Sequence, residues 1–262
     1  MSKVIGLFPF GEQVLPVLQA DKSEKAVFVL GVYASAVHAK WLDKNGKTLV
    51  RALAVASEPS IFWRGEDVDE IIASVEMPEE LGNLEPAASN LNGPSGLALD
   101  NHFLKPLGYE REDAWLCDLV PHSCMNEGQS RAIQREYEPW RAQYGLPRPT
   151  VPNVPKQLAD KTRRTAILKE LLQSKATTLI TLGDEPLKWF AGPLSGCRKR
   201  LKDFGETLNT YGKLHEIQIE GRTLNLLPLV HPRQAGRLGS HSVKWAELHE
   251  AWQKNSAPNL LS

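Results

Sequence analysis

Four short apolar runs, separated by segments with helical patterns, constrain the fold of this chain more than any other feature. They span Lys25–Ser35, Ala114–Pro121, Thr177–Gly183 and Leu226–Val230. Each run is apolar almost throughout rather than alternating, which is typical of strands that are covered on both faces. The clearest amphipathic helix, Leu158–Ala176, stands between two of them. We therefore predict an α/β fold with a central four-stranded parallel sheet flanked by helices.

Local turn and helix signals fill the intervals between these runs. Asn45-Gly46 lies between two strand-like segments and predicts a hairpin, and a second hairpin is expected to turn near Gly221. Helical patterns cover Val68–Val75, Gln129–Gly145 and Ser242–Lys254. The chain contains no internal repeat, and its length suits one large α/β domain, so we predict a single domain over residues 1–262.

The overall composition excludes a partner that is attracted by net charge. Lys and Arg number 31 and Asp and Glu also number 31, so any basic surface must be local. No stretch approaches the ~18 apolar residues of a membrane span, and the first residues do not resemble a signal peptide. Three cysteines without Cys-x-x-Cys spacing and seven scattered histidines predict no metal site and no cofactor. We expect a cytoplasmic protein with free thiols and no membrane partner.

The ends of the predicted strands are the expected location of a functional site, because ligands bind off the carboxyl ends of parallel strands. The segments at these ends are Gly31–Ala36, Asp118–Asn126, Gly183–Asp184 and His231–Gly239. In the last of them a buried strand stops at His231-Pro232 and continues into a short basic loop that contains two glycines. A histidine at this place either contacts a ligand or merely caps the strand.

Four motifs in a fixed order give the chain a resemblance to the uracil-DNA glycosylase superfamily. They are "VFVLGVYASAVHAKW", "GPSGLALDNHFLKPLGYEREDAWLCDLVPH", "TLITLGDEPLKWF" and "LLPLVHPRQAGRLG". Together they cover roughly Ala26–Trp252, apart from insertions near residues 40–90 and 125–155. The resemblance implies a single domain with the four-stranded parallel sheet of that family, which acts as a monomer on DNA.

The resemblance also implies a chemistry and assigns residues to it. Family members flip a base out of the duplex and hydrolyse the bond between base and sugar, which leaves an abasic site. The departing base is anionic, so the enzyme must hold that charge and supply water to the sugar. His231 matches the family histidine that donates a hydrogen bond to the base. Its loop matches the one that enters the minor groove, through Arg233, Gln234, Gly236 and Arg237.

The alternative for this loop is a solvated basic turn without a DNA contact. A second basic cluster, Arg198–Lys202, could add contacts to phosphate or could form an ordinary solvated surface.

The first motif departs from the family at the place of its water-activating carboxylate. One branch of the family places an Asp, and another a Glu, where this chain has Tyr33 and Val32 respectively. Neither side chain can act as a carboxylate base. Three explanations stay open: catalysis has been lost, another group positions the water, or stabilisation of the leaving group carries more of the barrier.

The predicted base pocket departs from the family as well. Ser35, preceded by Ala34, stands where the uracil enzymes have a bulky Tyr that excludes substituents on the base C5 position, and Leu91 falls near the place of the stacking Phe. Asp118 replaces the Asn that recognises uracil. An ionised Asp only accepts hydrogen bonds, which suits the exocyclic amino group of cytosine. The alternative is that Asp118 caps a neighbouring helix.

These departures lead to a hypothesis on the substrate. A cytosine-like edge and space at C5 suggest a C5-modified cytosine rather than plain uracil, such as the glucosylated hydroxymethylcytosine of phage DNA, and therefore a role in phage defence, with DNA repair as the alternative role. Three rivals remain: a non-catalytic DNA-binding member of the fold, a uracil-DNA glycosylase with a substitute water-positioning residue, and a nucleotide-binding α/β protein without a DNA role. The last predicts that Arg233 and Arg237 can be replaced by Ala without loss.

Overall fold

The computed structural model describes residues 4–261, and the chain divides into two compact units. The first, here called the antiparallel unit, contains the chain up to Val17 together with Tyr33–Pro94 and Pro121–Pro155. The second, here called the mixed-sheet unit, contains Leu18–Val32, Ser95–Val120 and the chain from Lys156 onward. The two segments expected as insertions, near residues 40–90 and 125–155, both belong to the antiparallel unit.

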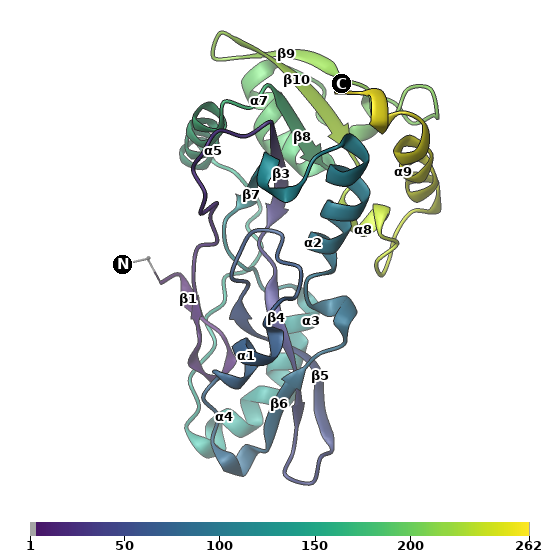
Figure 1. Ribbon diagram of the computed structural model, residues 1–262. Helices are drawn as coiled ribbons and strands as arrows, with labels where there is room; N and C mark the ends of the chain where they lie inside the picture. The colour runs from purple at the N-terminus through teal and green to yellow at the C-terminus, as the bar shows by residue number, and fades with distance from the viewer. Residues whose placement is uncertain (1–3, 262) are drawn as a thin grey trace. The chain divides into compact units, whose positions relative to one another are not determined.

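Within the described residues, a five-stranded sheet forms the centre of the mixed-sheet unit (Figure 1). Its strands, in spatial order, are β7 (Ala114–Val120), β3 (Val27–Tyr33), β8 (Thr178–Leu182), β10 (Arg222–Leu229) and β9 (His215–Ile219). Both β3 and β10 run parallel to β8, with Thr178 opposite Val27 on one side and opposite Asn225 on the other. The predicted α/β class and the mostly parallel character of the sheet are thereby confirmed.

The sheet differs from the predicted four parallel strands at one edge. The predicted hairpin near Gly221 adds β9, which pairs antiparallel with β10 and makes the sheet mixed. Glu220 and Gly221 both have positive φ, 47° and 74°, as a two-residue hairpin turn requires. Ile217 and Ile219 then bury one face of β9, so the extra strand adds apolar burial at this edge.

Helices cover this sheet on both sides, and Figure 1 shows α5 on one side and α2 and α9 on the other. Their bounds are α2 Pro94–Leu99, α5 Lys161–Ser174, α6 Asp184–Pro186, α7 Gly192–Ser195, α8 Pro232–Ala235 and α9 Val243–Asn255. The predicted helix Leu158–Ala176 begins only at Lys161, because Asp160 accepts a hydrogen bond from Arg163 N at 2.8 Å as the N-cap.

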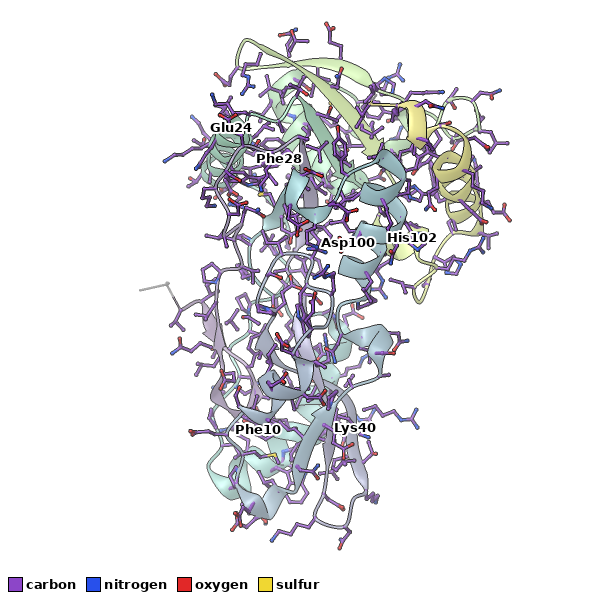
Figure 2. All side chains as sticks on the ribbon, in the orientation of Figure 1. Phe10, Glu24, Phe28, Lys40, Asp100 and His102 are labelled. Carbon is purple, nitrogen blue, oxygen red and sulfur yellow. The ribbon has the colours of Figure 1, made fainter. Side chains whose placement is uncertain are left out.

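Apolar side chains of the strands make the core of the mixed-sheet unit. Phe28 on β3 (labelled in Figure 2) is fully buried and stacks on Trp115 of β7, with ring centroids 6.5 Å apart. All residues of β7 and β8 are buried. Because each fully buried large apolar side chain contributes about 1.5–3 kcal/mol, these strands form a rigid base for the residues at their ends.

The antiparallel unit has its own sheet and its own core. Three strands lie in the order β5 (Thr48–Ser57), β4 (Ala36–Leu42) and β6 (Asn83–Pro86), and β1 (Gly6–Leu7) pairs with β2 (Gln13–Val14). The hairpin predicted at Asn45-Gly46 is confirmed as the β4–β5 turn, with Gly46 at φ 76°. Phe10 (labelled in Figure 2) packs edge-on against Trp41 and Tyr137 at 5.3 and 5.2 Å.

The helical segments of the antiparallel unit match the sequence patterns. The short helix near Val68–Val75 is α1 (Val68–Ala73). The helix expected over 129–145 begins slightly earlier, as α3 (Glu127–Ala132), continues through a π-helical turn and ends as α4 (Glu138–Tyr144). Among the described residues, no helix is long and apolar enough to cross a membrane.

Candidate functional site

His231 lies immediately beyond the carboxyl end of β10, next to the end of β8. Gly183 N donates to Leu229 O at 2.8 Å, which links the residue after β8 to the last residue of β10. A Cβ atom on Gly183 would lie 3.5 Å from His231 Cβ, so the two strand ends are in close contact. Pro232 follows as the first residue of α8, where its fixed φ suits a helix start.

One hydrogen bond decides which nitrogen of His231 carries the proton. The Arg233 backbone N–H donates to His231 Nδ1 at 3.2 Å, so Nδ1 is the acceptor and the ring proton resides on Nε2. Burial of the ring, together with the Arg233 guanidinium, lowers the pKa of His231 to about 4. At neutral pH the side chain is therefore a neutral imidazole whose Nε2–H is a hydrogen-bond donor.

The predicted DNA-binding residues of the loop after His231 differ in their exposure to solvent. Arg233 and Arg237 are exposed, and Arg237 lies 3.5 Å from Glu250 in a solvent-exposed ion pair of small strength. Gln234 instead accepts a hydrogen bond from the backbone N–H of Ser242, the N-cap residue of α9, at 2.5 Å. Gly236 ends α8 as its C-cap. The loop therefore exposes two cationic side chains to solvent, while Gln234 connects the loop to the start of α9.

Asp118 lies in β7, two residues before the end of that strand, and is only 4% exposed. Arg163 donates to the main-chain carbonyl of Asp118 at 2.6 Å and to that of Leu119 at 3.1 Å. The neighbouring helix α5 is capped by Asp160 rather than by Asp118. The guanidinium thus holds the backbone of β7 and does not bind the Asp118 carboxyl group, which is available for another role.

Burial raises the pKa of the Asp118 carboxyl to about 7, against the opposing effect of Arg163. The side chain is therefore divided between two states near neutral pH. Ionised, it only accepts hydrogen bonds; protonated, it also donates one, as an Asn does. The residue type alone predicts the ionised form, and burial adds the protonated form with its second hydrogen-bonding pattern.

His231 and Asp118 belong to the same sheet but do not neighbour each other. β3 and β8 lie between their strands in the order β7-β3-β8-β10. At a strand spacing of about 4.8 Å, the axes of β7 and β10 are on the order of 14 Å apart. The two side chains therefore lie at separate places along the strand ends and are not in direct contact with each other.

Three residues of the predicted base pocket, Tyr33, Ala34 and Ser35, line one cavity of the antiparallel unit. The cavity has a volume of about 60 Å³, well below the ~300 Å³ at which pockets for drug-sized ligands begin. Leu91 does not line it and is 38% exposed, and Val32 belongs to the mixed-sheet unit. The cavity therefore has room for a small group.

A buried carboxylate that the sequence analysis missed holds the first motif in place. Glu58, 5% exposed and directly after β5, accepts a hydrogen bond from Ser35 N at 3.0 Å. The Ser123 hydroxyl donates to Ser35 O from the other side. The main chain of Ser35 is thus fixed at both its N–H and its C=O group. No sequence pattern marks Glu58, because its partner lies 23 residues away across a sheet.

His38 adds an unpaired polar atom to the wall of the same cavity. Its Nδ1 is buried without a hydrogen-bond partner among the described residues, and burial lowers the pKa of the ring. Its main chain is fixed by Asn92, which accepts from His38 N at 2.8 Å and donates to His38 O at 2.9 Å. The neutral ring is therefore held at the cavity with one nitrogen unsatisfied.

Charge is distributed unevenly between the two units. The mixed-sheet unit holds 21 Lys and Arg against 17 Asp and Glu, while the antiparallel unit holds 10 against 14. In the basic cluster Arg198–Lys202, Arg200 binds the Asp203 carboxylate through two bonds of 3.1 Å. The mixed-sheet unit therefore has four more basic than acidic residues, although part of this cluster is neutralised internally.

No group of three or more His, Cys, Asp or Glu side chains that could hold a metal ion occurs among residues 4–261. The three cysteines are free thiols, and burial raises the pKa of Cys117 and Cys124. No protein-family model matches this chain, and no curated protein matches it.

Proposed function

We propose that this protein is a monofunctional DNA glycosylase, with the four-stranded parallel core of the uracil-DNA glycosylase fold inside its mixed sheet. It would flip a base and hydrolyse its N-glycosidic bond, leaving an abasic site. The observation that carries the proposal is the state of His231, a neutral imidazole at a strand end whose Nε2–H is the only ring donor. This is the donor that an anionic leaving base requires.

The chemistry of His231 follows from its protonation state. As the glycosidic bond breaks, negative charge develops on the base, and a preorganised donor stabilises that charge more than it stabilises the neutral base. A neutral imidazole can do this without first losing a proton, because its pKa of about 4 keeps it in one state throughout the physiological range. We assign His231 as the catalytic contact to the leaving group.

Asp118 is assigned as the residue that recognises the base. In its ionised form it accepts a hydrogen bond from the exocyclic amino group of cytosine. In the motif that resembles the family's first motif, Ala34 and Ser35 lack the bulk that would exclude a C5 substituent. We therefore propose a C5-modified cytosine as the target, such as hydroxymethylcytosine or its glucosylated form in phage DNA, and hence a role in phage defence. A glucosyl group is too large for the cavity of about 60 Å³ that Ala34 and Ser35 line, so it would have to lie outside that cavity.

Arg233 and Arg237 are assigned to the DNA backbone and minor groove. Both are exposed and cationic, and they lie in the unit with the excess of basic residues. Because such contacts release counterions from DNA, the binding constant should fall steeply with salt. Glu58 is assigned a supporting role, since it fixes the Ser35 peptide of the first motif.

The test is a panel of single strands and duplexes that carry uracil, thymine, cytosine, hydroxymethylcytosine or its glucosylated form. Abasic product is revealed by cleavage in alkali. We expect product from the modified cytosines and none with the His231→Ala variant. His241→Ala is the matched control, because His241 lies beyond the loop, with its Nδ1 3.0 Å from Gly239 O.

Each rival function predicts a different result in this panel. Release of uracil alone would identify a uracil-DNA glycosylase that positions water by another residue. Salt-dependent DNA binding without any abasic product would identify a non-catalytic member of the fold, which the absence of a carboxylate at Val32 and Tyr33 favours. Ligand binding that is insensitive to salt and to Arg233→Ala would indicate a nucleotide-binding protein.

A further inference from the structure

A buried chain of hydrogen bonds lies behind His231 within the mixed-sheet unit. Val230 N donates to the Tyr211 hydroxyl oxygen at 3.0 Å, and that hydroxyl lies 2.7 Å from His249 Nδ1. His249 Nε2 in turn lies 2.9 Å from His102 O. Tyr211 precedes β9, His249 is in α9, and His102 (labelled in Figure 2) follows α2, so three distant segments meet here.

The proton positions in this chain are forced by the groups at its two ends. The Val230 amide can only donate, so the Tyr211 oxygen accepts from it. The His102 carbonyl can only accept, so His249 carries its proton on Nε2 and leaves Nδ1 as an acceptor. The hydroxyl proton of Tyr211 must then point to His249 Nδ1. Every polar atom of the chain has a partner, in a single arrangement.

The surroundings keep this arrangement neutral and rigid. Tyr211 is 2% exposed and His249 is fully buried. Burial lowers the pKa of His249 to about 3 and raises that of Tyr211, so neither group changes charge near neutral pH. Phe103 and Trp252 pack on the His249 ring, with ring centroids 4.4 and 5.0 Å away. The chain is therefore a fixed structural link rather than a proton relay.

Val230 is the point at which the sheet no longer holds the backbone. Residue-by-residue pairing of β10 with β8 ends at Leu229, and the next amide, that of Val230, is bound by Tyr211 instead. His231 follows at once, and its ring is held from the other side by Arg233 N. At the residue before His231, the backbone is thus held by the Tyr211 hydroxyl, which is itself hydrogen-bonded to His249.

We propose that Tyr211 and His249 are positioning residues that set the orientation of His231, an inference that rests on the proposed function of His231. Core stability alone does not require them, because replacing both partners of a buried hydrogen bond by apolar groups can be nearly neutral. A fully satisfied buried polar network instead specifies one geometry. Here that geometry is the position of the Val230 amide, one residue before His231.

The test compares the wild type with Tyr211→Phe, which leaves Val230 N–H and His249 Nδ1 unpaired. NMR of protein labelled with ¹⁵N-histidine reports the ring signals of His231, assigned by their loss in His231→Gln. We expect a single Nε2–H tautomer in the wild type, and displaced or broadened His231 signals in Tyr211→Phe. Base release should slow by about 10- to 100-fold, with the DNA dissociation constant within about two-fold of wild type.

Phe103→Leu is the control for a merely structural role, because Phe103 packs on His249 but takes no part in the hydrogen bonds. It should lower Tm and leave the His231 signals in place. If Tyr211→Phe does not fold, His249→Asn breaks the link to His102 O and should displace the same signals less.

Two outcomes separate this inference from the proposed function. Unchanged His231 signals and an unchanged rate in a folded Tyr211→Phe variant would overturn the positioning role. A wild-type protein that releases no base overturns the glycosylase proposal alone. In that case the His231 signals still support or overturn the positioning role.

Discussion

His231 and Asp118 are both ionisable groups at the strand ends of one sheet, yet burial leaves them in different situations. It lowers the pKa of His231 to about 4 and raises that of Asp118 to about 7. Both shifts favour the neutral form, because a low-dielectric environment disfavours charge of either sign. Only Asp118 ends up close to neutral pH, so only its charge is sensitive to conditions.

The two residues also differ in what is held. The ring of His231 itself accepts a hydrogen bond from Arg233 N, so its tautomer is decided by the backbone. At Asp118 the Arg163 guanidinium binds the main-chain carbonyl. Its positive charge opposes the rise in the pKa of the carboxyl group without a hydrogen bond to that group. In the proposed function, the contact to the leaving group is therefore invariant, whereas recognition of the base depends on pH.

The largest expected effect is the loss of the His231 donor. Replacing it by Gln or Ala should slow base release by about 10²- to 10³-fold, the usual cost of one donor to a developing anion. Single-turnover rates measure this, and the DNA dissociation constant should hardly change. An equal loss in DNA affinity would instead mean that His231 contributes to binding in general.

Replacing Asp118 by Asn should alter the choice of base. The amide always offers one donor and one acceptor, so it suits uracil better than cytosine. We expect the ratio of uracil to cytosine-type release to rise by about 5- to 150-fold, which corresponds to 1–3 kcal/mol. Competition between two labelled duplexes measures the ratio, and an unchanged ratio would remove Asp118 from base recognition.

The stability of the protein should carry the signature of the same carboxyl group. Its folded pKa is raised, so the folded state retains a proton that the unfolded chain has already lost between pH 4 and 7. The free energy of unfolding should therefore fall by about 2 kcal/mol from pH 5 to pH 7 through this group.

Asp118→Asn cannot titrate and should lack this loss of stability. Its Tm should rise relative to wild type as the pH increases, by about 2–4 °C for each kcal/mol. Thermal unfolding of both proteins at pH 5, 6, 7 and 8 measures the difference. Parallel curves of Tm against pH would show that the Asp118 carboxyl is not protonated in this range. The charge of Asp118 would then be as insensitive to pH as that of His231.

The smallest expected effect concerns the loop. Arg233→Ala should weaken DNA binding a few-fold and should reduce the slope of log K against log salt by about 1. Gln234→Ala should leave the slope intact, since Gln234 is uncharged, but should lower Tm because Ser242 N loses its acceptor. Salt titrations of the two variants, side by side, separate a DNA contact from support of the loop.

Local patterns in the sequence were sufficient for the elements that local physics decides. The four strands followed from continuous apolar runs, and the β4–β5 hairpin followed from Asn45-Gly46. The start of α5 was predicted less accurately, because the cap residue Asp160 and not the apolar pattern decides where the helix begins. The place of His231 followed from the end of an apolar run at His231-Pro232.

What the sequence by itself determined is therefore the set of strands, the helices between them and the histidine at a strand end, since short-range periodicity and turn chemistry encode these. Only the tertiary structure decided the tautomer of His231, the raised pKa of Asp118 and the link from Tyr211 to His249, 38 residues apart. Burial and long-range hydrogen bonds depend on which segments meet in space, and those properties set the protonation states on which the proposed chemistry depends.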